Sequence, residues 1–359
     1  MRDEIISLAQ KLIQIESVRE NKIGLQEVLG LVKIDLSQNS MVEFEDSGVP
    51  GLFFSNRKNN TQQYKVILNA HLDVVPGSAE QFKPFLRDGR LYGRGAYDMK
   101  AAAAVEILVF RELAEKLTYP LGLQLVTDEE VGGFCGTKYQ VDQGIRAEFI
   151  IVGEPTNLDI GHKAKGILWT KILFRGESAH GAYLWQGKNA IWEMERFLEQ
   201  LKSVYPVPTE EVWQTTVNVA QVMTENSVYN KVPDKCELKL DVRFVPEDKD
   251  LVLDKIKKLL PDGAEMEVIL QESSQYTESN NPYLVQLQKC CSETRGADCE
   301  VIARHGGSDL RFFDQVGGKG VEFGPVGYGH HTDEEWVEVE SLERYYEILK
   351  SFLLSLDGV

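Results

Sequence analysis

The sequence contains no long hydrophobic run, no paired cysteine motif and no excess of positive charge. None of its apolar stretches approaches the ~18 residues of a membrane-spanning helix, and its N-terminal segment is charged and amphipathic, unlike a secretory signal peptide. Its five cysteines form no Cys-x-x-Cys pair, which favours free thiols in a reducing cytoplasm over a disulfide framework. The formal net charge of −17 argues against nucleic acids and anionic membranes as partners. We therefore expect a cytoplasmic protein.

The composition is that of an ordinary globular protein. The chain has 359 residues, of which 43% are hydrophobic and 26% are charged. This length is enough for two domains at the usual ~150 residues each. The acidic surface does not exclude a small anionic substrate, because a local pocket can still be cationic.

One stretch, residues 66–100, gathers three potential metal ligands. An apolar run that starts at Val66 is long enough for a buried strand and leads to His71, with Asp73 two residues later. Residues two apart in an extended chain face the same side, so these side chains point together. Asp98 ends a glycine-containing turn and precedes a helix-forming run from Met99. An imidazole with nearby carboxylates suits zinc.

Residues 1–165 alternate between helix and strand patterns, which implies a mostly parallel sheet covered on both faces. In such sheets, ligands bind outside the carboxyl ends of the strands. The pattern predicts helices over 3–15, 23–36 and 101–116, and strands over 41–44, 52–55, 66 to about 71, 121–126 and 149–152. Polar side chains follow several of these strand ends, namely His71, Glu129, Glu130 and Glu154.

Beyond residue 165 the pattern changes to that of a second, inserted domain. Strands are predicted over 167–174, 215–224, 236–244 and 265–270, and helices over 189–203 and 251–260. The order β-α-β-β-α-β is that of a ferredoxin-like unit. We therefore predict a catalytic domain formed by residues 1–165 and 274–359, with a lid and dimerisation domain at 166–273. The last segment is predicted to contain helices at 283–291 and 341–355, and strands at 299–303 and 321–323.

Seven motifs occur in an order that closely resembles one enzyme family: HLDVVPG, GRGAYDMK, TDEEVGG, VGEPT, GESAHGA, GGSDLRFF and GHHTDEEWVEV. They resemble the dinuclear-zinc amidohydrolases and peptidases that include acetylornithine deacetylase, succinyl-diaminopimelate desuccinylase, aminoacylase and glutamate carboxypeptidase. The resemblance covers essentially the whole chain. It implies a zinc-peptidase-like α/β catalytic domain with an inserted ferredoxin-like lid, two Zn²⁺ ions for which Co²⁺ or Mn²⁺ can substitute, and a homodimer formed through the lid.

The same resemblance implies hydrolysis of an amide bond next to a free carboxylate. An N-acyl amino acid is the expected substrate, and a metallo-dipeptidase or carboxypeptidase activity is the alternative. The loop HGGSDLRFF is close to the desuccinylase version but shorter. An alternative of another class is a non-catalytic relative that only binds a carboxylated ligand. The sequence contains all five expected metal ligands and also Glu129, the expected general base, which argues against a non-catalytic protein.

The resemblance also assigns the metal ligands. His71 and Glu154 are expected to bind one zinc ion, Glu130 and a late histidine the other, and Asp98 to bridge them; Asp73 is expected to orient His71 and Glu129 to act as general base. Two adjacent acids cannot occupy one coordination position, so one ligand and one free acid is a natural division. The alternative is that Glu129 and Glu130 are two solvated acids in a polar turn, which would be the usual interpretation of such a pair on its own. In the family pattern, three residues separate the histidine from an acid that is followed by an aromatic or apolar residue. His331 with Glu335 and Trp336 fits this pattern and is the expected ligand, whereas His330, the alternative, is one residue out of register.

The remaining expected contacts belong to the substrate. By resemblance, His180 crosses from the partner subunit to donate a hydrogen bond to the tetrahedral oxyanion, and Asn230 and Arg243 contact the substrate carboxylate or the oxyanion. An ordinary loop histidine and an outward-facing arginine are the alternatives. An anion nest is also expected from Gly306, Gly307 and Ser308. Of the other histidines, we expect His162 to be structural and His305 to adjoin the pocket.

Overall fold

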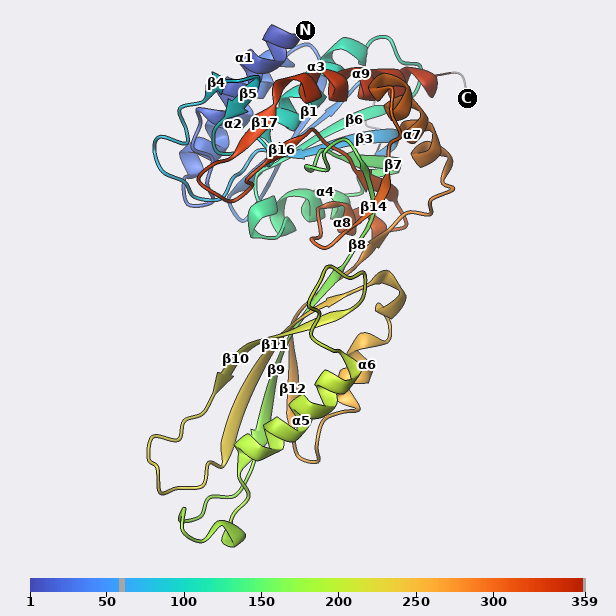
Figure 1. Ribbon diagram of the computed structural model, residues 1–359. Coiled ribbons are helices and arrows are strands. Elements are labelled where there is room, and N and C mark those ends of the chain that lie inside the picture. Colours follow the sequence, from blue (N-terminus) through green and yellow to red (C-terminus); the bar gives the residue numbers. More distant parts are fainter. Residues whose placement is uncertain (58–61, 358–359) are drawn as a thin grey trace. The chain divides into compact units, whose positions relative to one another are not determined.

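The computed structural model describes residues 1–57 and 62–357 (Figure 1). The chain divides into two compact units. Unit 1 comprises Met1–Lys163, Tyr276–Ala303 and Ser308–Val359, and unit 2 comprises Ala164–Gln275 and Arg304–Gly307. The last two residues of the predicted C-terminal segment, 358–359, lie outside the described residues. Among the described residues, no helix combines the length and the apolar character needed to cross a membrane.

Unit 1 is built on a mixed sheet whose centre is parallel. The strand order is β1 (Ser40–Asp46), β2 (Val49–Ser55), β6 (Leu121–Val126), β3 (Gln63–His71), β7 (Arg146–Val152), β15 (Lys319–Glu322), β8 (Ile160–Ala164) and β13 (Gln275–Tyr276), and β14 (Val301–Arg304) pairs with β8. Strand β3 is parallel to both β6 and β7, and β7 is parallel to β15. All six residues of β6 are buried, as expected for a parallel strand covered on both faces.

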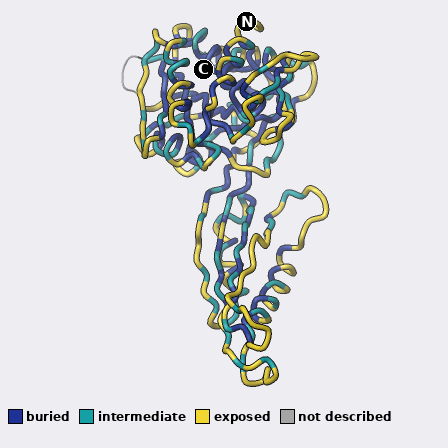
Figure 2. Tube along the Cα trace, turned by 90° about the vertical axis from the view of Figure 1, so that its left-hand side faces the viewer, coloured by how far each residue is buried: buried dark blue, intermediate teal, exposed yellow. Residues whose placement is uncertain are grey.

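Helices cover both faces of this sheet (Figure 1). One face packs against α1 (Arg2–Ile13), α2 (Lys22–Asp35), α3 (Lys100–Leu113), α7 (Pro282–Arg295) and α9 (Val339–Ser355), and the other against α4 (Tyr139–Asp142) and α8 (Leu310–Asp314). The strand β7 shows how the two cores alternate: Ile151 belongs to the first core, whereas Ile150 and Val152 belong to the second. Figure 2 shows these buried segments running through unit 1.

The ends of α7 illustrate how the sequence sets element boundaries. The Asn281 side chain accepts hydrogen bonds from the backbone N–H groups of Tyr283 and Leu284, and Pro282 occupies the first helical position. At the other end, Gly296 adopts a left-handed conformation with φ of 65°, which ends the helix without steric cost.

Unit 1 also contains a small second sheet that the sequence pattern did not predict. Its order is β16 (Gly327–Tyr328), β17 (Trp336–Glu338), β5 (Arg90–Tyr92) and β4 (Phe85–Arg87). These strands have only two or three residues each, too few for a period-two pattern to be read. Strand β8 was also missed. Short helical segments connect other elements: η1 (Glu129–Val131), η2 (Phe134–Lys138), η3 (Leu184–Gln186) and η4 (Pro246–Asp248).

Unit 2 has the predicted β-α-β-β-α-β order and its own hydrophobic core. Its elements are β9 (Gly166–Arg175), α5 (Ala190–Val204), β10 (Thr216–Met223), β11 (Lys235–Phe244), α6 (Val252–Lys257) and β12 (Glu265–Glu272). The antiparallel sheet has the order β10-β11-β9-β12, with β10 and β12 at its edges. Helix α6 is shorter than the predicted 251–260, because Leu259 and Leu260 donate to carbonyls three residues earlier in a tightened last turn. The predicted fold class is confirmed.

Candidate metal centre

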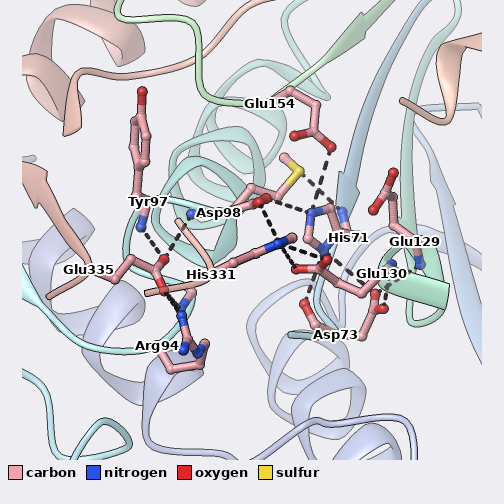
Figure 3. Close-up of polar contacts among 12 residues, drawn as sticks. His71, Asp73, Arg94, Tyr97, Asp98, Glu129, Glu130, Glu154, His331 and Glu335 are labelled. Atoms are coloured by element: carbon pink, nitrogen blue, oxygen red, sulfur yellow. Dashed lines mark hydrogen bonds and ion pairs between the residues drawn. The ribbon is translucent and has the colours of Figure 1, made fainter. Parts of the chain in front are cut away.

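Three parallel strands of unit 1 end beside one another, and each end carries a predicted ligand. His71 is the last residue of β3, Glu130 lies in η1 just after β6, and Glu154 comes two residues after β7. Because β3 is hydrogen-bonded to both β6 and β7, their carboxyl ends meet at one edge of the sheet. Figure 3 shows these side chains pointing toward one another.

His71 forms one candidate ligand group with Asp98 and Glu154. Its Nε2 atom lies 3.0 Å from Asp98 Oδ1 and 3.7 Å from Glu154 Oε1. Its ring is 2% exposed. Burial lowers the pKa of His71, but hydrogen bonds with Asp73 and Asp98 outweigh it and raise that pKa well above its ordinary value. One atom from each of the three side chains lies within 4.8 Å of the others.

His331 forms a second candidate group with Asp98 and Glu130. Its Nε2 atom lies 2.9 Å from Glu130 Oε2 and 3.4 Å from Asp98 Oδ2. These two carboxylates raise the pKa of His331 to about 10. The two oxygens of Asp98 therefore face different histidines, so that this carboxylate belongs to both groups.

His330 does not share this position. Its ring centroid lies 5.6 Å from that of His331 and 6.1 Å from that of Tyr97. Neither candidate group found among residues 1–57 and 62–357 contains it. The geometry therefore brings His331, and not His330, to the acidic cluster.

Asp73 contacts the cluster in two ways. Its backbone carbonyl lies 3.0 Å from His71 Nδ1, while its carboxylate oxygen is 3.6 Å from the same atom. The carboxylate also accepts hydrogen bonds from the backbone N–H groups of Glu129, at 3.2 Å, and Glu130, at 3.1 Å. Asp73 therefore fixes the turn that carries both glutamates as well as the His71 ring.

Glu129 and Glu130 occupy different places although they are adjacent. Glu130 contacts His331, whereas Glu129 belongs to neither ligand group. Burial, together with the charges of Asp309 and Glu130, raises the pKa of Glu129 well above its ordinary value, against the opposing charge of His71. The side chain of Glu129 is thus a carboxylate beside the ligand groups with enhanced basicity.

The charge balance of this cluster fits a divalent cation. Four carboxylates, those of Asp98, Glu129, Glu130 and Glu154, surround two imidazoles. Burial and the neighbouring charges of Asp98 and Glu129 raise the pKa of Glu154 well above its ordinary value. Imidazole nitrogens with carboxylate oxygens suit zinc and similar transition metals. Cations at the two groups would relieve this excess of buried negative charge.

The predicted substrate residues lie elsewhere in the chain. His180 is exposed, and its backbone forms an isolated antiparallel β-bridge with Lys231. The backbone N–H of the next residue, Gly181, donates to the Asn230 carbonyl at 2.7 Å. Arg243 on β11 pairs with Asp241 at 2.9 Å. These residues belong to unit 2, as do Gly306 and Gly307, which are exposed.

Three other predicted positions also have defined surroundings. Ser308, in unit 1, is buried, and its carbonyl accepts a hydrogen bond from Arg311 Nη1 at 2.7 Å. His162 Nδ1 lies 2.7 Å from the Thr277 carbonyl. His305 Nε2 lies 3.0 Å from a carboxylate oxygen of Glu211. The five cysteines are free thiols.

Curated relatives match the chain along almost its entire length. The succinyl-diaminopimelate desuccinylase of Polynucleobacter necessarius is 27% identical over 379 residues, which cover 98% of each protein. The enzyme of the same name from Methylibium petroleiphilum is 28% identical over 381 residues, covering 97% of each.

Solved structures share the fold. Aminopeptidase PepT from Bacillus cereus superposes with a TM-score of 0.81 at 19% identity, covering 98% of both chains. A dinuclear metal-binding peptidase of the M20 family from Bacillus subtilis gives 0.74 at 14% identity, covering 100% of this chain and 99% of that chain. The model of peptidase family M20/M25/M40 matches residues 67–355. This match spans most of the chain, so the protein belongs to peptidase family M20/M25/M40 and is a hydrolase that acts on amide bonds.

Proposed function

We propose that the protein is a two-metal hydrolase that removes the acyl group from an N-acyl amino acid. The observation that carries this proposal is the pair of ligand groups that share Asp98. His71, Glu154 and Asp98 would hold one cation, and Glu130, His331 and Asp98 the other. We propose Zn²⁺ as the native metal, with Co²⁺ or Mn²⁺ able to replace it.

The residues around the cluster divide the chemical work. When bound, the two cations would polarise the scissile carbonyl and lower the pKa of the attacking water. Glu129 takes the proton of that water and returns it to the leaving amine. Glu129 belongs to neither ligand group, so its carboxylate is available for both transfers. Asp73 holds Glu129 and Glu130 through their backbone N–H groups.

The substrate is proposed to carry a free carboxylate beside the amide. His180, Asn230, Arg243, Gly306, Gly307 and Ser308 are the proposed contacts. Arginine binds a carboxylate through two parallel hydrogen bonds, and Arg243 would exchange Asp241 for this partner. The names of the curated relatives support an N-succinyl amino acid, whereas the fold shared with an aminopeptidase keeps short peptides as the second candidate.

A substrate panel tests this function. The protein loaded with Zn²⁺, Co²⁺ or Mn²⁺ is given N-succinyl and N-acetyl amino acids, dipeptides, and the same acyl amino acids with the α-carboxylate esterified. We expect hydrolysis of a free acid and at least ~10-fold lower kcat/KM for its ester. The ester lacks the charged carboxylate that accepts two parallel hydrogen bonds from Arg243. Dipeptide hydrolysis alone would support the peptidase alternative. No turnover with both cations bound would indicate a non-catalytic relative.

We also propose that the protein is a cytoplasmic homodimer, with residues 1–165 and 274–359 as catalytic domain and 166–273 as lid. The division into two compact units supports these ranges to within two residues at each boundary, except that Arg304–Gly307 belong to unit 2. In unit 2, the edge strand β10 exposes Val219 and Val222 at 44% and 48%, and α5 exposes Trp192 at 60%. An unpaired strand edge with exposed apolar side chains is suited to pairing with a second copy.

A mixed-dimer experiment tests whether His180 acts across that interface. Two inactive variants, Glu129→Gln and His180→Ala, are combined under conditions of subunit exchange. A mixed dimer would contain one site with an intact base and an intact His180, so activity should recover to about a quarter of wild type if exchange is statistical. Proven exchange without recovery would place His180 in its own subunit's site or outside catalysis. A strictly monomeric protein would exclude the proposal.

A further inference from the structure

Glu335 is a buried carboxylate that receives four hydrogen bonds from one loop. It is 2% exposed and lies four residues after His331. Its Oε1 atom accepts from the backbone N–H groups of Tyr97, at 2.9 Å, and Asp98, at 3.0 Å. Its Oε2 atom accepts from the Gly95 N–H, at 3.0 Å, and from Arg94 Nη1, at 2.8 Å. Figure 3 shows the carboxylate facing Arg94 and the backbone N–H groups of Tyr97 and Asp98.

The main chain around Glu335 reinforces this connection. Its carbonyl accepts a hydrogen bond from the Gly93 N–H at 3.2 Å. The next residue, Trp336, pairs with Tyr92 where β17 meets β5. Glu335 therefore joins the segment that carries His331 to the segment that carries Asp98, through its side chain and its backbone.

A third ligand-bearing loop joins the same assembly through Tyr97. The Tyr97 hydroxyl donates to Asn157 Oδ1 at 2.9 Å, and the Gly327 N–H donates to the same oxygen at 3.2 Å. Asn157 follows Glu154 by three residues. The loops that present Asp98, His331 and Glu154 are thus connected by hydrogen bonds that do not involve any proposed ligand atom.

The charge on Glu335 is balanced within this arrangement. Arg94 is 3% exposed and pairs with Glu335, so the two buried charges offset each other. The three backbone donors converge on the carboxylate from a short turn. By accepting these hydrogen bonds, Glu335 fixes the path of the backbone at Asp98. It thereby fixes the position of the Asp98 carboxylate, which faces both His71 and His331.

We propose that Glu335 is a positioning residue that holds Asp98 and His331 in the arrangement required to bind two cations. This inference rests on the proposed metal centre. Glu335 does not contact the cations or the substrate and acts only through the two loops. Residues that orient metal ligands typically change metal affinity ~10–100-fold when they are replaced.

Glu335→Gln tests this role, with Glu334→Gln as the matched control. Gln keeps the size of Glu335 but replaces one acceptor oxygen with an NH₂ group that faces N–H donors. Glu334 is the adjacent, exposed glutamate. Calorimetric titration of metal-free protein with Zn²⁺ and Mn²⁺ should show ~10–100-fold weaker binding for Glu335→Gln and an unchanged Kd for Glu334→Gln. The visible spectrum of the Co²⁺-loaded protein should change only in Glu335→Gln.

Further variants separate positioning from a general loss of stability. Glu335→Gln leaves Arg94 as an unpaired buried cation, which can destabilise the fold, so the double variant Arg94→Met/Glu335→Gln removes both charges. It should fold, as judged by circular dichroism and Tm, and still bind metal weakly. Glu335→Asp retains the carboxylate and should recover part of the affinity. Folded Glu335→Gln or double variant with a Kd within twofold of wild type would overturn the inference, whereas wild-type protein that binds no cation would overturn the metal centre itself.

Discussion

Glu129→Gln is expected to retain two equivalents of metal while its kcat falls by roughly 10²–10⁴-fold, the usual contribution of a positioned general base. Gln has the same shape as Glu but cannot accept and return a proton. Metal content should persist because Glu129 belongs to neither ligand group. The backbone N–H of residue 129 donates to Asp73 whether the side chain is Glu or Gln, so the turn that carries Glu130 should also remain in place. The measurements are kcat and metal content on the same preparation.

Glu130→Gln is the matched control, because it makes the same chemical change one residue away. Glu130 contacts His331 at 2.9 Å and belongs to one ligand group only, so this variant should lose about one equivalent of metal as well as activity. If Glu129→Gln kept both its metal and a near-normal kcat, Glu129 would not be the base. If it lost metal as readily as Glu130→Gln, the division between ligand and free acid would be wrong.

The positions of the predicted ligands followed from local sequence. Apolar runs such as residues 121–126 are buried on both faces and must end at the edge of the sheet, so polar residues just beyond them collect there. His71, Glu130 and Glu154 were placed in this way. The spacing from His331 to Glu335 also selected the histidine that the structure brings to Glu130, but it did not reveal what Glu335 contacts.

The contacts between loops could not be predicted, because they depend on how distant segments meet. Asp98 was expected between two cations by resemblance, yet only the structure shows its two oxygens directed at different histidines. The Asp73 carboxylate was expected to orient His71, and the structure adds its hydrogen bonds to the turn at Glu129. Glu335 served only to set the spacing from His331, and nothing in the sequence indicated which groups its carboxylate contacts. Its donors, which lie between Arg94 and Asp98, are 237 to 241 residues away in the sequence.

The short strands were missed for a related reason. Strands β4, β5, β16 and β17 are stable as a sheet only because segments 85–92 and 327–338 meet. Two or three residues provide neither an alternating pattern nor an apolar run. This small sheet nevertheless matters, because β5 leads into the loop that carries Asp98 and β17 follows the loop that carries His331. It is therefore part of the support for the candidate metal centre.

Asp98→Asn is expected to lose both cations together and to be inactive. Asp98 Oδ1 lies 3.0 Å from His71 Nε2, and Oδ2 lies 3.4 Å from His331 Nε2, so one side chain serves both groups. Asn retains one oxygen and no charge, and its NH₂ group is directed at one of the two groups. Removing a shared ligand should weaken the binding of each cation by more than ~100-fold. This exceeds the loss of affinity that follows when a residue that only orients a ligand is replaced.

Variants of the unshared ligands give the contrast that makes this result specific. Glu154→Gln and Glu130→Gln each alter one group only, so each should retain about one equivalent of metal after dialysis, whereas Asp98→Asn should retain none. Metal analysis and titration with Zn²⁺ distinguish these outcomes, and circular dichroism verifies the fold. Asp98→Asn that lost one cation and bound the other at wild-type affinity would show that the two groups are independent. In that case Asp98 would be a ligand of one cation, and the geometry in which its oxygens face two histidines would not describe the loaded centre.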